Sequence, residues 1–197
     1  MSDQDHRFMR AALALGRRGQ GQTWPNPAVG CIIVRGARIV GRGWTQPGGR
    51  PHAEVLALEQ AGALAKGATA YVTLEPCAHV GKTPPCASAL IAAGVCRVVA
   101  AIEDSDVRVS GKGFAMLRAA GIAVTTGILA PSAAQDHAGF LLKTGLGRPW
   151  VTLKLANSFD GRIATASGES RWITGPEARR AVHGMRMRHD AVMVGGG

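Results

Sequence analysis

Long apolar runs, aromatic residues and acidic residues are all scarce in this chain of 197 residues. No apolar run reaches the roughly 18 residues that a membrane span requires. The polar start of the chain, residues 1–6, also differs from a secretory signal. We therefore expect no membrane partner and a cytoplasmic location. Aromatic residues make up only 5% of the chain, too few for a platform that stacks nucleic-acid bases.

The 13 acidic residues are outnumbered by 23 lysines and arginines, which gives a formal net charge of +10. This excess predicts an anionic partner, either a nucleic acid or a phosphorylated metabolite. The basic residues are spread along the chain instead of forming a block, so no dedicated nucleic-acid arm is expected. The four cysteines of a cytoplasmic protein are better suited to metal ligation or burial than to disulfides.

Hydrophobic periodicity predicts an α/β fold with a mixed sheet covered by helices on both faces. Helices are expected at residues 5–18, 52–65, 86–93, 114–120 and 130–144. Strands are expected at residues 29–34, 38–43, 69–74, 95–102 and 122–127. The Gly- and Pro-containing stretch 145–149 resembles a domain boundary. Beyond it, two further strands, at 150–156 and 191–194, and a helix at 176–188 are expected.

The strongest chemical pattern combines His52 and Glu54 with Cys77 and Cys86. Zinc binds imidazole nitrogen and thiolate sulfur in tetrahedral geometry, and a catalytic zinc leaves its fourth position to water. One histidine and two cysteines supply three ligands, and the charge of zinc lowers the pKa of water toward about 7. Glu54 can then accept and return the proton. The pattern is typical of zinc deaminases, although here eight residues separate the two cysteines.

The insert between the two cysteines contains Gly-Lys-Thr, but Pro76 stands where a phosphate-binding P-loop needs glycine. The insert instead brings His79, Lys82 and Thr83 close to the expected zinc. Lysine offers a charge to phosphate, and threonine offers hydrogen bonds. Asn26, held between two prolines, has an amide that can bind the edge of a heterocycle. The alternative for the insert is a solvated polar loop, and the alternative for Asn26 is an ordinary turn residue.

Four segments resemble the deaminase half of the bifunctional deaminase–reductase family of riboflavin biosynthesis: residues 24–34, 48–58, 67–86 and 111–113. The stretch 148–175 resembles the start of the reductase half. The resemblance implies a cytidine-deaminase-like three-layer α/β/α domain at residues 1–147. It also implies an incomplete dihydrofolate-reductase-like segment at residues 148–197.

The resemblance further implies hydrolytic removal of the 2-amino group from 2,5-diamino-6-ribosylamino-4(3H)-pyrimidinone 5′-phosphate, which yields 5-amino-6-ribosylaminouracil 5′-phosphate. It implies His52, Cys77 and Cys86 as zinc ligands and Glu54 as the catalytic proton carrier. Substrate contacts are implied for Asn26, His79, Lys82 and Thr83. The reductase half of the family uses NADPH, and positions that contact nucleotide or substrate there match Ala156, Ser170, Trp172 and Arg186.

Three features depart from the family pattern. Residues 104–109 read Asp-Ser-Asp-Val-Arg-Val where the family usually has Asp-Pro-Asn-Pro-x-Val in a loop that frames the site. His137 replaces a usual asparagine. Residues 148–197 are too few for a reductase domain of ordinary size, so we expect little reductase activity from this chain alone. An incomplete lobe with exposed apolar segments would also favour a homo-oligomer.

Two other functions fit the same cluster. The first is a nucleic-acid or nucleoside base deaminase of the same superfamily, which would flip a base into the site. The second is a binding module stabilised by zinc. Structural zinc has four protein ligands, so Cys31 or Cys96 would have to complete the set. Otherwise, both cysteines are expected to be buried in strands.

Overall fold

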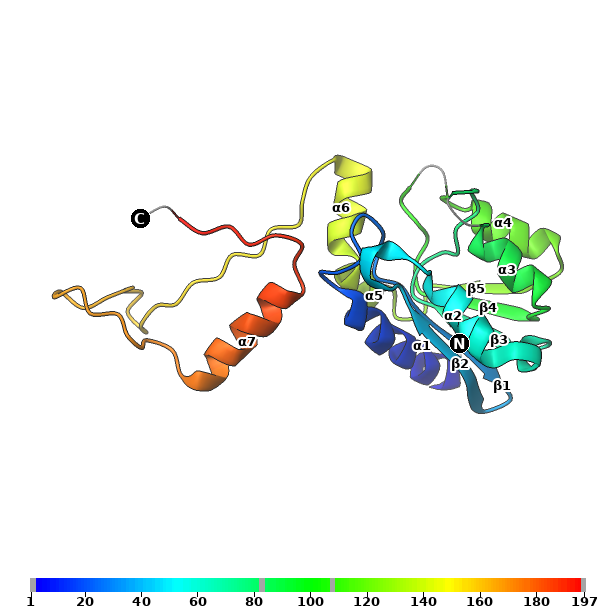
Figure 1. Cartoon of the computed structure of the whole chain (residues 1–197), viewed down its shortest axis with the longest axis horizontal. Helices are drawn as coiled ribbons and strands as arrows, with labels where there is room; N and C mark the ends of the chain where they lie inside the picture. Colours follow the sequence, from blue (N-terminus) through cyan, green and yellow to red (C-terminus); the bar gives the residue numbers. More distant parts are fainter. Residues whose placement is uncertain (1–2, 82–83, 107–108, 196–197) are drawn as a thin grey trace. The chain divides into compact units, whose positions relative to one another are not determined.

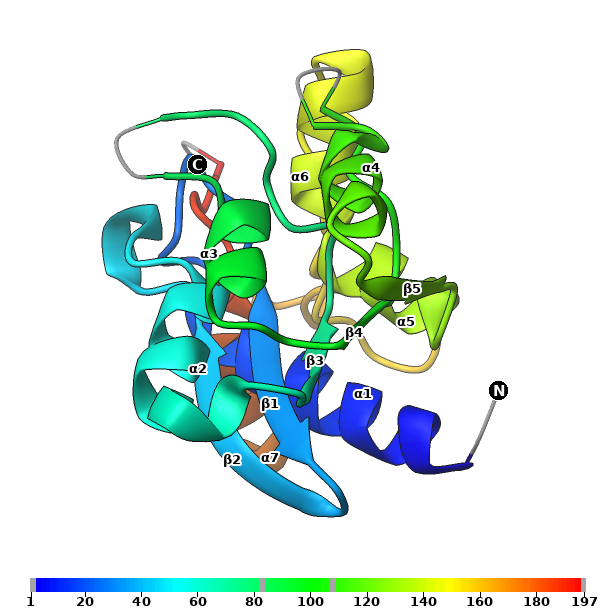
Figure 2. The same cartoon turned by 90° about the vertical axis from the view of Figure 1, so that its right-hand side faces the viewer.

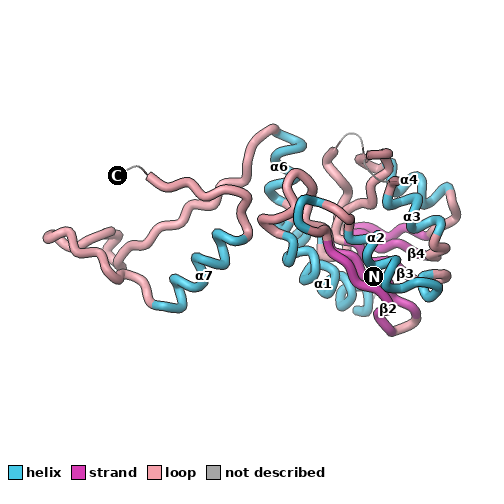
Figure 3. Tube along the Cα trace, in the orientation of Figure 1, coloured by secondary structure: helices cyan, strands magenta, loops and turns pink. Residues whose placement is uncertain are grey.

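The computed structural model describes residues 3–81, 84–106 and 109–195, and the chain divides into two compact units, Met1–Trp150 and Val151–Gly197. The first unit holds the sheet and most of the helices (Figures 1 and 3). Its helices are α1 (Asp3–Gly16), α2 (Ala53–Ala61), α3 (Cys86–Ala92), α4 (Lys112–Ala119), α5 (Ala130–Asp136) and α6 (Ala138–Leu146). Its strands are β1 (Gly30–Arg35), β2 (Arg38–Trp44), β3 (Thr69–Val72), β4 (Arg97–Ala100) and β5 (Ala123–Thr126).

The five strands form one mixed sheet in the order β2-β1-β3-β4-β5. Strand β1 is antiparallel to its hairpin partner β2 and to β3, while β3, β4 and β5 run parallel. The parallel strands are connected through α3 and α4, which is the arrangement that alternating strands and helices predict. The mixed sheet expected from the sequence is therefore confirmed.

Successive residues of each strand enter two different cores, because side chains alternate across a sheet. Cys31 and Ile33 pack with α2, α3 and α4, whereas Ile32 and Val34 pack with α1 and α5. The same alternation holds in β3, where Val72 and Tyr71 face opposite sides. Figure 2 shows α2 and α3 on one side of the sheet and α1 on the other. This gives the three-layer α/β/α architecture that was expected.

Two glycines allow helices to lie unusually close to the sheet. A Cβ atom at Gly30 would overlap the carbonyl oxygen of Ala12 in α1. A Cβ atom at Gly43 would overlap the carbonyl oxygen of Ala53, the first residue of α2. The close approach at Gly43 fixes the start of α2 against the sheet. Because His52 immediately precedes that start, the backbone of His52 is positioned as well.

An ion pair between a buried carboxylate and a partly exposed arginine ties α1 to the sheet. The Asp5 carboxylate accepts hydrogen bonds from the Arg97 guanidinium at 2.9 and 3.1 Å and from the Tyr71 hydroxyl at 2.9 Å. Burial, followed by the hydrogen bond to Asp5, raises the pKa of Tyr71 to about 12. The paired charges let an acidic residue remain in the core beside Phe8, whose ring contacts Tyr71.

Two sequence-based expectations about secondary structure are wrong. Residues 130–144 form α5 and α6 instead of one helix, and they separate at the buried His137. In the second unit, residues 150–156 and 191–194 form no strand within the described range, although α7 (Pro176–Met187) is present. An apolar segment becomes a strand only when a neighbouring strand supplies hydrogen bonds, and no partner pairs with these segments. Among the described residues, no helix has the length and apolar character needed to span a bilayer.

Candidate metal centre and its cavity

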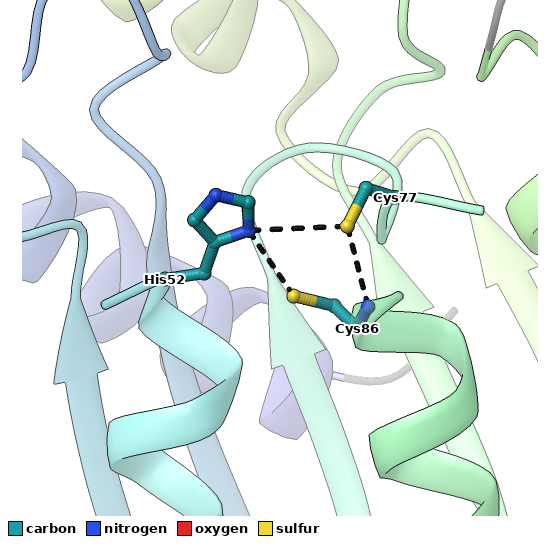
Figure 4. Close-up of side chains that lie close together, drawn as sticks. All are labelled: His52, Cys77 and Cys86. Atoms are coloured by element: carbon teal, nitrogen blue, oxygen red, sulfur yellow. Dashed lines mark hydrogen bonds between the residues drawn. The ribbon is translucent and has the colours of Figure 1, made fainter. Parts of the chain in front are cut away.

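Three side chains from different parts of the sequence meet at one edge of the sheet. His52 immediately precedes α2, Cys77 lies in the loop after β3, and Cys86 is the first residue of α3. Figure 4 shows the imidazole and the two thiols pointing toward one another. Loops at the carboxyl ends of parallel strands are the usual place for active sites in α/β folds, because the connecting helices begin there.

The spacing of these atoms fits a zinc ion. His52 Nδ1 lies 3.3 Å from Cys86 Sγ and 3.8 Å from Cys77 Sγ, and the three ligand atoms all lie within 4.8 Å of one another. Tetrahedral bonds of zinc to nitrogen and sulfur place the ligand atoms roughly 3.3–3.8 Å apart. Nδ1 is therefore the imidazole atom suited to ligation. The donor set of one nitrogen and two sulfurs is also the set that zinc prefers.

The cluster already favours a negatively charged sulfur. A hydrogen bond from the Cys86 thiol, supported by hydrogen bonds from His52 and from the backbone amide of Cys86, lowers the pKa of Cys77 to about 4. The hydrogen bond to Cys77 raises the pKa of His52 in turn. Thiolate is the form of cysteine that binds metal, so this geometry prepares Cys77 as a ligand.

Glu54 lies in the first turn of α2 and is buried. Burial is the main cause that raises the pKa of its carboxyl, while the charge of His52 opposes the rise. A raised pKa makes a carboxyl easier to protonate, which helps a residue that must both accept and donate a proton. Glu54 also lines the cavity described next.

A cavity of about 460 Å³ opens beside the cluster. Its lining includes five residues singled out in the sequence: Asn26, His52, Glu54, Cys77 and His79. The other two expected substrate contacts, Lys82 and Thr83, lie outside the described residues. Cavities of this volume are typical for small molecules, because they enclose most of the ligand surface.

The side chain of Asn26 contacts the imidazole of His52. Its side-chain amide donates to the carbonyl oxygen of Gly49 at 2.8 Å, and the same nitrogen lies 3.4 Å from His52 Nε2. The Thr23 hydroxyl donates to the Asn26 carbonyl oxygen at 2.9 Å, which fixes the backbone of the turn. Asn26 therefore touches the expected zinc ligand as well as the cavity. Side chains beside a ligand histidine hold its ring in position.

Glu75 is the functional residue that the sequence analysis did not identify. Its buried carboxylate accepts four backbone N–H bonds, from Asp104 and Gly111 on one oxygen and from Gly113 and Phe114 on the other. These bonds, 2.9–3.2 Å long, hold the loop after β4 and the start of α4 against the cavity. The available signal was the acidic residue directly before Pro76 and Cys77.

The loop that departs from the family pattern contributes Asp104 and Asp106 to the cavity wall. Burial raises the pKa of Asp104 to about 6, and its carboxylate accepts the backbone N–H of Asp106 at 2.8 Å. Positions 107 and 108 of the loop lie outside the described residues. His137 is buried with Nε2 3.1 Å from the Thr73 hydroxyl, and burial lowers its pKa to about 4.

Neither Cys31 nor Cys96 joins the metal-ligand cluster found among the described residues. Cys31 is fully buried in β1, and burial raises the pKa of its thiol. Cys96 is exposed and directs its thiol to the carbonyl oxygen of Gly67 at 3.1 Å, so the expectation that both cysteines are buried is wrong for this one. A set of three protein ligands leaves one tetrahedral position open, which is the pattern of a catalytic zinc site.

The four residues expected to serve a reductase lie in the second unit: Ala156, Ser170, Trp172 and Arg186. Trp172 is exposed, and the Arg179 guanidinium lies 4.5 Å from its ring centroid. None of the four lines the cavity of the first unit. Their reductase roles remain predictions.

The family described as the cytidine and deoxycytidylate deaminase zinc-binding region matches residues 2–102, which is more than half of the chain. The chain belongs to this deaminase family. A second family, the RibD C-terminal domain, matches residues 149–197. The cluster of His52, Cys77 and Cys86 therefore lies in a deaminase domain, and the match to the RibD C-terminal domain covers the second unit.

Comparison with individual proteins gives the same result as the family matches. The riboflavin biosynthesis protein RibD of Haemophilus influenzae is 55% identical over 98% of the chain, and that of Escherichia coli is 54% identical over 97%. The chain spans about half of each relative, 52% in both cases.

Solved structures show the same likeness. Acinetobacter baumannii RibD superimposes with a TM-score of 0.85 at 52% identity, over 94% of this chain and 52% of that one. The bifunctional deaminase/reductase of Thermotoga maritima gives a TM-score of 0.88 at 40% identity, over 93% of this chain and 53% of that one. These matches confirm the resemblance drawn from the motifs.

Proposed function

We propose that this chain catalyses the zinc-dependent hydrolytic deamination of 2,5-diamino-6-ribosylamino-4(3H)-pyrimidinone 5′-phosphate in riboflavin biosynthesis. The observation that carries this proposal is the cluster of His52, Cys77 and Cys86, with His52, Cys77 and the buried Glu54 on the wall of a cavity of about 460 Å³. The relatives named for riboflavin biosynthesis supply the pathway. The deaminase/reductase name of the Thermotoga maritima structure supplies the substrate.

His52, Cys77 and Cys86 would hold the zinc, which when bound acts as a Lewis acid toward water and the substrate. Glu54 takes a proton from the attacking water as the oxygen bonds to the ring carbon that carries the 2-amino group. Glu54 then delivers that proton to the neighbouring ring nitrogen. It takes the second proton from the newly formed hydroxyl and passes it to the amino group, so the C–N bond breaks, ammonia leaves and the carbonyl forms. Water is consumed, ammonia is released, and no redox partner is required. The raised pKa of Glu54 suits both directions of transfer.

The proposed substrate is a small phosphorylated pyrimidine and not a nucleic acid. The cavity volume suits one nucleotide-sized ligand, and the basic residues are dispersed along the sequence. Asn26 and His79 would contact the substrate from the cavity wall. The sequence-based roles of Lys82 and Thr83 in phosphate binding are kept in this proposal, as are a cytoplasmic location and self-association of the chain.

The decisive experiment measures ammonia release from the pyrimidine ribosyl phosphate by the zinc-loaded protein. We expect Glu54→Gln to lower kcat by roughly 10²–10⁴-fold, since it removes the proton carrier. Glu59→Gln is the matched control, because Glu59 is an exposed carboxylate on the same helix and should leave the rate unchanged. Equal rates for Glu54→Gln and wild type would overturn the mechanism. Deamination of an oligonucleotide but not of the pyrimidine phosphate would overturn the substrate.

A further inference from the structure

Two basic side chains, Arg50 and Lys143, lie among the described residues that line the cavity. Arg50 belongs to the loop between β2 and α2, and Lys143 belongs to α6. A phosphate carries most of the charge of a nucleotide, so a cation placed to meet it contributes strongly to affinity and selectivity. The surroundings of the two cations differ.

Lys143 is directed to an exposed aromatic ring that is not part of the cavity lining. Its Nζ atom lies 5.1 Å from the ring centroid of Trp24, which is a cation–π distance. Lys143 itself is exposed, and an exposed ammonium remains well hydrated. Lys143 can be compared with Arg50 as a possible phosphate-binding residue, because both side chains are positively charged and both line the cavity.

Arg50 lies beside two features that suit an anion. A Cβ atom on Gly81 would stand 3.2 Å from Arg50 Nη2, so the lack of a side chain there lets the backbone approach the guanidinium. The same position would lie 3.9 Å from the ring of His79. The Nδ1 atom of His79 is buried and has no hydrogen-bond partner within the described part of the chain. A buried nitrogen without a partner indicates a site that a ligand completes.

We propose that Arg50 binds the phosphate of the substrate and makes the deaminase selective for phosphorylated pyrimidines, an inference that rests on the proposed function. The planar guanidinium offers paired N–H donors that match two phosphate oxygens. His79 supplies a further hydrogen-bonding nitrogen on the same wall of the cavity. The backbone at Gly81 lies close to the guanidinium on the same wall.

The kinetic test compares the pyrimidine ribosyl phosphate with its dephosphorylated nucleoside. We expect Arg50→Met to lower kcat/KM for the phosphorylated substrate by roughly 10- to 100-fold, mainly through KM, and to change the nucleoside rate less than twofold. Arg50→Lys should recover part of the loss, because it keeps the charge but not the paired donors. Lys143→Met, the matched control, should preserve the preference for the phosphorylated substrate. Equal losses on both substrates, or no loss on either, would overturn the proposal.

A binding measurement separates this inference from the proposed function. The dissociation constants of ribose 5-phosphate and ribose are measured by calorimetry on zinc-loaded wild type and on Arg50→Met. We expect wild type to bind ribose 5-phosphate at least tenfold more tightly than ribose, and we expect Arg50→Met to lose most of that difference, with the remainder assigned to Lys82 and Thr83. If wild type binds both equally, Arg50 does not recognise phosphate. If wild type shows the binding difference but deaminates neither pyrimidine, the proposed reaction is wrong while the anion site stands.

Discussion

Replacing Glu75 with glutamine should destabilise the protein by several kcal/mol, although the two side chains have the same shape. The Glu75 carboxylate accepts two backbone N–H bonds on each oxygen. Glutamine retains one oxygen and places an NH₂ group where the other stood. Two buried N–H groups then face a donor instead of an acceptor, whichever way the amide is turned.

The expected loss follows from those two bonds. A hydrogen bond to a charged group contributes about 1.5–3 kcal/mol, so losing two of them costs about 3–6 kcal/mol of the free energy of unfolding. No reduction for solvent screening applies, because Glu75 is only 3% exposed. A typical domain has about 5–15 kcal/mol in total, so the variant should fold but unfold at much lower denaturant.

Urea unfolding at constant zinc measures this loss directly. The control is Glu103→Gln, since Glu103 is exposed and accepts one hydrogen bond, from the Ser110 hydroxyl at 2.9 Å. We expect the control to lose less than about 1 kcal/mol. Glu75→Gln should also raise KM for the pyrimidine phosphate, because Asp104 and the start of α4 are no longer held against the cavity. A loss below about 1 kcal/mol for Glu75→Gln would refute the four-bond account.

Three other perturbations test separate parts of the molecule. Asp5→Asn should lower the free energy of unfolding by about 1–3 kcal/mol, which is less than the loss for a fully buried ion pair because Arg97 is partly exposed. Urea unfolding measures this loss, and Asp3→Asn, at an exposed position on the same helix, is the control. Burial holds the pKa of His137 at about 4, below its ordinary 6.5, so the unfolded chain binds the proton more readily. The contribution of neutral His137 to the free energy of unfolding should therefore be fully present above pH 6.5 and decrease as the pH drops from 6.5 toward 4, by up to about 3 kcal/mol. His137→Asn should make the free energy of unfolding less dependent on pH in this range, and an unchanged dependence would show that another group causes it. Chelation of zinc should abolish ammonia release and lower Tm, since a ligand bound only to the folded state stabilises it, and added zinc should restore both; a Tm that ignores the chelator would argue against binding at the cluster.

The cluster of one histidine and two cysteines could be predicted because the chemistry of these residues is visible in residue type and spacing. His52, Cys77 and Cys86 each stand at the expected start of a helix or after an expected strand, and the fold brings these points to one edge. The sheet was predictable for a similar reason. Alternation in β1 places Ile32 and Ile33 in different cores, and only a strand covered on both faces permits that.

Glu75 and His137 were not predictable, because their partners are distant in the sequence. The N–H groups that bind Glu75 come from residues 104–114, and nothing local to Glu75 indicates them. The helical pattern runs through His137 without interruption, whereas its imidazole lies within hydrogen-bond distance of Thr73, which is 64 residues earlier in the chain. In the second unit, the apolar pattern of 150–156 is real, but periodicity cannot show whether a partner strand exists.

The electrostatics of the site depend on two opposing effects at the start of α2. The positive end of a helix dipole favours negative groups in the first turn, and this effect would keep Glu54 ionised. Burial acts against it and is the larger influence, so the pKa of Glu54 is raised while that of Cys77 falls to about 4. The difference arises because the hydrogen bonds from Cys86 and His52 outweigh burial at Cys77, whereas burial outweighs the charge of His52 and the hydrogen bond with Cys86 at Glu54. The hydrogen bonds at Cys77 thus favour its thiolate, and burial makes the Glu54 carboxyl easier to protonate than an ordinary glutamate, a combination suited to hydrolytic deamination.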